Sequence, residues 1–313
     1  MKESILLILV AWAAVTHAQR PGGHVELTAM GRQQKLDRWV PAGNYSGICA
    51  LRDGRYAVVS DKARENGYFV WHIDIDTLTG RIRRVDDLGF RSTGLPGRDV
   101  EGIAVEGETG HVCIACESDN RIVQMDASET PQVTATSESL LTDALPNSGL
   151  ESLCYDAVNH CLWTMEERGA NETARLLKLD TQLRVTGRYD YPLDAPTNRK
   201  RALHYARGVS EVLPIDEGRL LVLEREAFVP KRKIGAWVKC KLYVLTLETG
   251  EKTLLTQWKT RLNLTARSWA NYEGMCYGPT LADGSRLLLV ISDSQNRFSG
   301  VLHDWGRVFK VKS

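Results

Sequence analysis

The segment Tyr272-Glu-Gly-Met-Cys, followed by the turn Ala282-Asp-Gly and the apolar run Leu287-Leu-Leu-Val-Ile, decides the fold because its pattern recurs along the chain. Each copy has a five-residue opening, then a turn signal, then a strongly apolar strand. The openings are Tyr45-Ser-Gly-Ile-Cys, Val100-Glu-Gly-Ile-Ala, Leu150-Glu-Ser-Leu-Cys, Val209-Ser-Glu-Val-Leu and Tyr272-Glu-Gly-Met-Cys. They start 55, 50, 59 and 63 residues apart, which indicates five structural repeats.

The strand after each opening is apolar throughout rather than alternating, which indicates burial of both faces of each sheet. These strands are Tyr56-Ala-Val-Val-Ser, Val112-Cys-Ile-Ala-Cys, Leu162-Trp-Thr-Met, Leu220-Leu-Val-Leu and Leu287-Leu-Leu-Val-Ile. Antiparallel sheets stacked face to face around an axis form a β-propeller. We therefore predict an all-β propeller of five blades, each with four antiparallel strands. The alternatives are six blades, or a β-sandwich or two small β domains.

The ends of the chain bear on how the ring closes. The fifth repeat ends after Arg307-Val-Phe-Lys-Val, which is its third strand. We expect residues 25–37 to supply the missing outer strand, so that strands from both ends close the ring. Six blades would apply if the N-terminal region contained a degenerate blade.

The N-terminal residues are typical of a secretory signal peptide. Lys2 precedes an apolar run over residues 5–15, and small residues lead to a cleavage position after Ala18. The run is shorter than the roughly 20 residues that a membrane span needs. We predict a secreted or periplasmic protein without a membrane anchor, with residues 19–313 forming one propeller domain.

Composition excludes other classes. The 313 residues include 40 Lys and Arg against 39 Asp and Glu, so the net charge is +1 and a nucleic-acid partner is not indicated. A hydrophobic fraction of 43% excludes a disordered or fibrous chain. We expect a monomer that acts on a small anionic, phosphorylated substrate.

The chain has seven cysteines, an odd number, so at least one of them cannot take part in an intramolecular disulfide. Cys113 and Cys116 form a C-x-x-C within an apolar strand, which is more typical of packing than of a metal site. Cys154 and Cys161 stand where they could bridge a hairpin, or remain buried packing residues.

The second position of the five openings points to a metal. In a propeller the first strand of each blade lines the axis, so these residues form a ring: Ser46, Glu101, Glu151, Ser210 and Glu273. Carboxylates about 5.5 Å apart repel by roughly 3 kcal/mol per pair at an effective dielectric near 20. Carboxylate and hydroxyl oxygens suit calcium better than zinc, so we predict axial calcium. Protonated acids, or acids solvated in a wide channel, are the alternative.

Acids also end the second strand of every repeat, at the same end of the channel. They are Asp61, Glu117, Glu166 with Glu167, Glu224 and Asp293. Glu117, Glu166, Glu224 and Asp293 are candidate catalytic bases, with Glu166 preferred, and Arg168, Arg225 or Arg297 candidate stabilisers of developing charge. The alternative is that each acid forms a salt bridge with an arginine close by in sequence, as in Asp61 with Arg64 or Glu117 with Arg121. Two basic loops, 199–207 and 231–239, are expected on the same face.

These residues support a resemblance. Glu101-Gly102, Glu273-Gly274, Ser60-Asp61 and Ser292-Asp293 resemble the phytase-like β-propeller family described as having esterase-like activity, over nearly the whole mature chain. The order Ser, Glu, Glu, Ser, Glu also resembles the calcium-activated nucleotidases (apyrases), which are five-bladed with an axial calcium. That resemblance implies calcium ligands at Ser46, Glu101, Glu151, Ser210 and Glu273.

Two functions follow as hypotheses. The first is a secreted, calcium-dependent hydrolase of phosphate esters or anhydrides. The second is a non-catalytic propeller that binds a sugar, a peptide or a protein, with calcium in a structural role. A serine-esterase mechanism is not supported because the chain has no G-x-S-x-G motif and no ordered triad context for its histidines.

Overall fold

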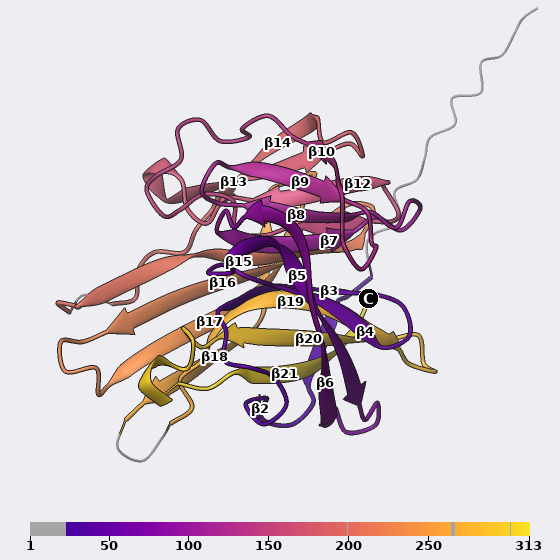
Figure 1. The fold of residues 1–313 in the computed structure, drawn as a ribbon. Helices are drawn as coiled ribbons and strands as arrows, with labels where there is room; N and C mark the ends of the chain where they lie inside the picture. The colour runs from indigo at the N-terminus through magenta and orange to yellow at the C-terminus, as the bar shows by residue number, and fades with distance from the viewer. Residues whose placement is uncertain (1–22, 199, 264–266, 301) are drawn as a thin grey trace, which may run out of the picture.

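The computed structural model describes residues 23–198, 200–263, 267–300 and 302–313, which form a five-bladed β-propeller (Figure 1). The first two blades are β3 (Tyr45–Ala50), β4 (Arg55–Ser60), β5 (Glu65–Ile75), β6 (Ile82–Pro96) and β7 (Val100–Val105), β8 (Val112–Cys116), β9 (Arg121–Met125), β10 (Val133–Thr136). The next two are β11 (Cys154–Asp156), β12 (Cys161–Met165), β13 (Thr173–Leu179), β14 (Val185–Pro192) and β15 (His204–Asp216), β16 (Arg219–Val229), β17 (Ala236–Thr246), β18 (Lys252–Leu262). Each is an antiparallel four-stranded sheet, as predicted.

The fifth blade joins the two ends of the chain. It contains β19 (Asn271–Thr280), β20 (Arg286–Asp293) and β21 (Trp305–Lys312), and its outer strand is β1 (Glu26–Ala29). β1 pairs antiparallel with β21, with Leu27 opposite Val311, and β2 (Gln34–Lys35) pairs with the start of β21. The predicted closure by residues 25–37 is therefore confirmed.

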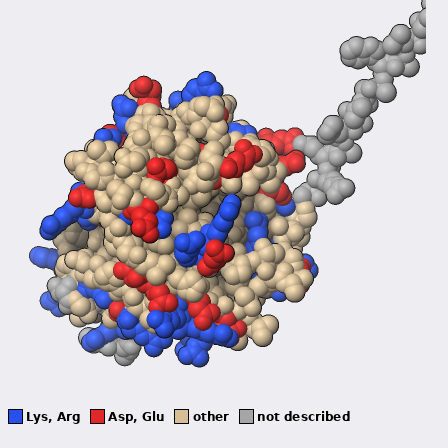
Figure 2. All heavy atoms as spheres, turned by 45° about the vertical axis from the view of Figure 1, so that its right-hand side comes forward, with Lys and Arg blue, Asp and Glu red and all other residues tan. Residues whose placement is uncertain are grey.

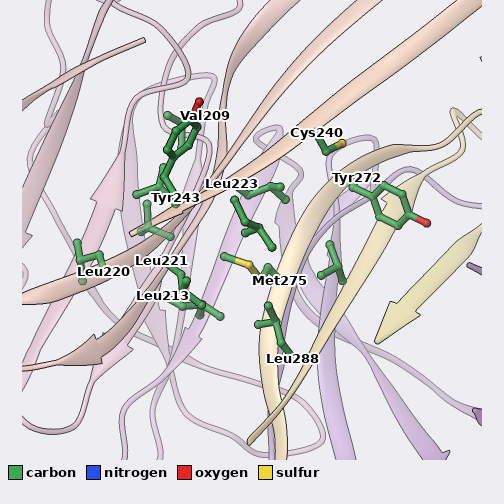
Figure 3. Close-up of a cluster of buried hydrophobic side chains, with 14 of the residues drawn as sticks. Val209, Leu213, Leu220, Leu221, Leu223, Cys240, Tyr243, Tyr272, Met275 and Leu288 are labelled. Carbon is green, nitrogen blue, oxygen red and sulfur yellow. The ribbon is translucent and has the colours of Figure 1, made fainter. Parts of the chain in front are cut away.

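The inner strands form the ring, and their apolar neighbours hold the blades together. β3 contacts both β7 and β19, and β15 contacts both β11 and β19. Between the fourth and fifth blades, Leu221 and Leu223 of β16 pack near Met275 of β19 and Leu288 of β20 (Figure 3). These side chains are fully buried, which agrees with strands that are apolar on both faces.

The fourth blade is longer than its neighbours at one end. β15 to β18 extend toward the left of Figure 1, and the ends of β15 and β16 pair as far as His204 opposite Val229. This extension begins where β15 passes the axis at Val209, so it forms a wall beside one mouth of the central channel.

Two further parts of the fold are short 3₁₀ turns, η1 (Ala170–Glu172) and η2 (Phe298–Gly300). No helix within the described ranges has the length and apolar character needed to cross a bilayer. The predicted signal, residues 1–18, lies outside the described residues. Acidic and basic side chains are interspersed over the face shown in Figure 2.

The cysteines are free thiols. In the β11–β12 hairpin Cys154 lies opposite Trp163 and Cys161 lies opposite Asp156, so the two cysteines are offset along the ladder. A Cys154–Cys161 disulfide, left open by the sequence, is therefore wrong for this structure. Cys113 and Cys116 are buried in β8, where they pack in the core.

Candidate functional site

A β-bulge recurs at the opening of each blade. The ladder slips between Tyr45 and Gly47, between Val100 and Gly102, between Val209 and Glu211, and between Tyr272 and Gly274. In each case the residue that the bulge leaves without a ladder partner is the second motif residue. In the third blade, Leu150 lies opposite Glu166 and Cys154 opposite Trp163, which leaves one extra residue around Glu151 as well. Bulges of this kind redirect side chains at functional sites.

The bulged glutamates line one end of the channel, and we call this region the axial acid centre. It is a cavity of about 320 Å³. Its carboxylates are Asp61, Asp99, Glu101, Glu117, Glu151, Glu167, Glu273 and Asp293, and its cations are Lys62 and Arg225. Eight acids therefore line the cavity together with two basic groups, and three of the acids, Glu101, Glu151 and Glu273, are the ring glutamates identified in the sequence.

The two bulged serines behave differently from the glutamates. The hydroxyl of Ser46 donates a hydrogen bond to the carbonyl of Val100 at 2.7 Å, and that of Ser210 lies 3.3 Å from the carbonyl of Tyr272. Both acceptors are the first motif residue of the next blade. Ser46 and Ser210 do not line the cavity, so in this structure they connect neighbouring blades.

Arg225 is the cation at the centre. Its Nη2 lies 2.8 Å from Glu151, 3.1 Å from Glu167 and 3.4 Å from Glu273, with side-chain exposure of 10%. The sequence placed Arg225 among the charge-stabilising candidates, and the structure brings it into the cavity. Lys62 lies at the rim, within 3.0 Å of Asp61 and 2.6 Å of Asp99.

Burial controls the titration of these acids. It raises the pKa of Glu151 to about 8, with Glu167 raising it further and Arg225 opposing the shift. Burial likewise raises the pKa of Asp293 to about 7, although a hydrogen bond from the Gln295 amide opposes this. The pKa values of Glu101 and Glu273 are raised well above the usual range, first by burial and then by neighbouring carboxylates. The centre therefore holds fewer negative charges at neutral pH than its acids could supply.

Two of the predicted catalytic acids lie elsewhere. Glu166 is fully buried, and its carboxylate accepts hydrogen bonds from Arg175 Nε at 2.8 Å and Nη2 at 2.7 Å. Glu224 accepts hydrogen bonds from the Tyr191 hydroxyl at 2.7 Å and from Lys252 Nζ at 2.6 Å. Both acids were predicted to lie at the end of the channel, and this prediction is wrong. Adjacent residues of a strand point to opposite sides of the sheet, so these two side chains point away from the channel.

Their sequence neighbours face the axis instead: Glu167 beside Glu166, and Arg225 beside Glu224. Among the predicted bases, Glu117 and Asp293 do line the cavity. The sequence analysis missed Asp99, which precedes the second opening and has a positive φ of 57°. Only its adjacency to the motif could have indicated it.

The predicted arginines also need correction. Arg297 lies away from Asp293: its guanidinium donates to Asp304 at 2.6 Å and to the carbonyl of Val40 at 2.6 Å. Arg168 is half-buried and does not line the axial acid centre. Within the described ranges, none of the five acids that end a second strand pairs with the nearby arginine of its own repeat. The salt-bridge alternative in that form is therefore wrong.

Fold and site together define a five-bladed β-propeller whose axis ends in a buried acid cavity. A comparison with protein families matches residues 40–295 to the family described as Phytase-like: Esterase-like activity of phytase. The chain belongs to this phytase-like family, as the Glu-Gly and Ser-Asp pairs predicted.

A comparison with solved structures gives matches at low identity. Hydrazine synthase of Kuenenia stuttgartiensis is 10% identical with a TM-score of 0.41, and the match covers 81% of this chain and 57% of that chain. Streptogramin B lyase is 15% identical, covers 92% and 97%, and has a TM-score of 0.38. A luciferin-regenerating enzyme is 12% identical, covers 90% and 95%, and has a TM-score of 0.46. The comparison with curated proteins gives no match.

Proposed function

We propose that this protein is a secreted, calcium-dependent hydrolase of phosphate esters or anhydrides that acts at the axial acid centre. The observation that carries the proposal is the excess of eight carboxylates over two cations around one cavity at the end of the channel. A bound divalent cation would favour the ionised form of these acids and attract an anionic substrate.

The donor atoms suit calcium, because all of them are carboxylate oxygens. Asp61, Asp99 and Glu101 each offer one oxygen within 4.8 Å of the others. That spacing is about twice the calcium–oxygen distance of roughly 2.4 Å, so such oxygens can share one ion. We propose these three residues as ligands together with Glu151 and Glu273. Of the five, Glu101, Glu151 and Glu273 were predicted from the sequence.

When bound, calcium would polarise the phosphoryl group that is to be attacked. The chain's own residues would do the rest. Arg225 would bind phosphoryl oxygens through its guanidinium, which is held in place by Glu151, Glu167 and Glu273. Asp293 uses Oδ1 to accept the Gln295 amide hydrogen at 2.6 Å, which leaves Oδ2 to accept a proton from the attacking water. A pKa of about 7 suits a general base near neutral pH.

The test is phosphate release from a nucleoside triphosphate, inositol hexakisphosphate and 4-nitrophenyl phosphate, in calcium and in excess chelator. We expect calcium-dependent release from at least one of them. Asp293→Asn should lower kcat by about 100-fold or more, which is the usual contribution of a general base. Asp53→Asn is the matched control, because Asp53 lies on the exposed β3–β4 turn.

Absence of release from every substrate would contradict the proposal and favour the non-catalytic binding module with structural calcium. Equal turnover by the Asp293→Asn and Asp53→Asn variants would instead remove Asp293 from the mechanism and leave the hydrolase in place.

A further inference from the structure

A second and larger cavity adjoins the axial acid centre on the side of the fourth blade. Its volume is about 580 Å³, within the range of small-molecule sites. Ala206, Arg225, Asn271 and Gln295 line both cavities. These four residues form the boundary between the two cavities, so groups bound in the two cavities would lie on either side of the same side chains.

The walls of this second cavity are mainly apolar. Val229 and Ala236 come from the extended ends of β16 and β17, and Ile234 from the loop between them. Trp269 and Leu302, each 7% exposed, contribute from the fifth-blade side. The long fourth blade thus supplies one side of an apolar pocket.

Its rim carries apolar side chains that are open to solvent. Ile234 is 57% exposed and Phe298 is 44% exposed. Lys233 Nζ lies 4.0 Å from the centroid of the Phe298 ring, which links the β16–β17 loop to η2. Exposed apolar groups gathered at the entrance of a cavity are typical of a binding site.

The boundary between the cavities holds unused hydrogen-bonding groups. Asn271 is 6% exposed, and its side-chain amide donates to Glu273 at 2.6 Å, but its Oδ1 has no partner among the described residues. Arg225 Nε also has none there. Buried polar atoms are rarely left unpaired. An unpaired donor and an unpaired acceptor at this boundary therefore indicate a ligand whose polar atoms lie between the two cavities.

We propose that the second cavity binds the aryl or bulky alkyl group of a phosphate monoester whose phosphoryl group lies at the axial acid centre. The inference rests on the proposed function. Hydrolysis breaks the bond between phosphorus and the ester oxygen, water supplies the replacing oxygen, and the products are inorganic phosphate and an apolar alcohol. Inositol phosphates and sugar phosphates are disfavoured because most of the wall is apolar and would not replace the hydrogen bonds that their hydroxyl groups make to water, although His204, Lys233 and Arg267 also line the cavity.

Binding is tested without turnover by using two phosphonates that cannot be hydrolysed, 2-naphthylmethylphosphonate and methylphosphonate. Both are titrated calorimetrically into the calcium-loaded protein. Burial of the naphthyl group should make the first bind at least about 100-fold more tightly than the second. Equal affinities would overturn the proposal.

Two variants test whether the preference for the naphthyl phosphonate arises in the second cavity. Ala227 lines the second cavity only, so Ala227→Phe should fill it and reduce the naphthyl preference by about tenfold or more, with methylphosphonate affinity unchanged. Ile234→Ser should reduce the preference severalfold and keeps the test decisive if the first variant does not fold. Leu78→Ser is the matched control, because Leu78 is 90% exposed on the β5–β6 turn. A naphthyl preference that survives in both cavity variants would overturn the assignment.

Turnover separates this inference from the proposed function. We expect kcat/KM for 2-naphthyl phosphate to exceed that for glycerol phosphate by about 100-fold. Equal turnover of the two would contradict the inference and leave the hydrolase in place. No turnover of either, together with selective and cavity-dependent naphthyl binding, would contradict the hydrolase and retain the apolar site.

Discussion

Two groups of buried acids in this propeller have opposite electrostatic surroundings. In the axial acid centre, eight carboxylates share two cations, and burial raises the pKa of Glu151 to about 8. The other group lies between the third and fourth blades. We call it the interblade ion network, and it consists of Tyr191, Asp194, Glu224, Lys241, Tyr243 and Lys252.

In the interblade ion network the two acids, Asp194 and Glu224, are matched by nearby donors. Lys252 Nζ lies 2.6 Å from Glu224 and 2.7 Å from Asp194, and Lys241 also pairs with Asp194. Burial would raise the pKa of Asp194, but hydrogen bonds from Lys241, Lys252 and Tyr243 hold it below its usual value. The balance of acids and donors, rather than burial alone, therefore distinguishes a structural network from a site that favours an added cation.

The largest expected effect comes from removing the shared cation of the interblade ion network. Lys252→Met leaves Glu224 and Asp194 short of a partner in a mostly buried place, so we expect a loss of about 3 kcal/mol of unfolding free energy. Urea unfolding measures it. Lys310→Met is the control, because its pair with Asp283 is largely exposed and should contribute less than about 1 kcal/mol. Equal losses would show that the network does not act as a buried unit.

Calcium should act on the axial acid centre alone. At a concentration of about 100 times the dissociation constant it should add about 2.7 kcal/mol of stability, seen as a higher melting temperature than in chelator. Glu151→Gln should weaken this increment, because it removes one converging charge. Glu166→Gln should lower stability by breaking the contact with Arg175 but leave the calcium increment intact. The opposite pattern would place the metal elsewhere.

Stability should respond to pH with opposite signs in the two regions. Glu151 has an ordinary pKa of 4.5 and a folded pKa of about 8, so between these values the unfolded chain releases a proton that the folded protein retains. In chelator, such a group should reduce stability by about 1.4 kcal/mol per unit as pH rises through this window. Asp194, whose pKa is lowered, should cost stability only as pH falls below about 4. Melting temperatures from pH 3 to 8 that show no decline toward pH 8 would contradict the raised pKa of Glu151.

The smallest effect concerns the serines. Ser46→Ala removes the hydrogen bond to the Val100 carbonyl, which should cost about 1 kcal/mol and leave the calcium increment unchanged. Loss of the increment would instead restore Ser46 to the ligand set predicted from the sequence. Thermal melts in calcium and in chelator distinguish the two results.

The sequence was sufficient to predict the five-bladed ring, because every repeat has the same opening and the same strand with apolar residues on both faces. It also identified Glu101, Glu151 and Glu273, since one register position recurs in each blade. It did not separate Glu166 from Glu167, because the direction of a side chain depends on where the bulge lies in the ladder. The partner of Glu166, Arg175, comes from a different strand, and no local pattern indicates that pair.

The pairing of β1 with β21 also bears on the order in which the protein is made. β1 emerges from the ribosome before the other described strands, yet its partner β21 is the last of them to be synthesised. Four blades contain all of their own strands in one continuous segment, whereas the sheet of the fifth cannot form before β21 has been synthesised. Until then β1 has no strand to pair with and the blade that contains β19 is unfinished. The axial acid centre, to which β19 contributes Glu273, should therefore assemble only after β21 has been synthesised.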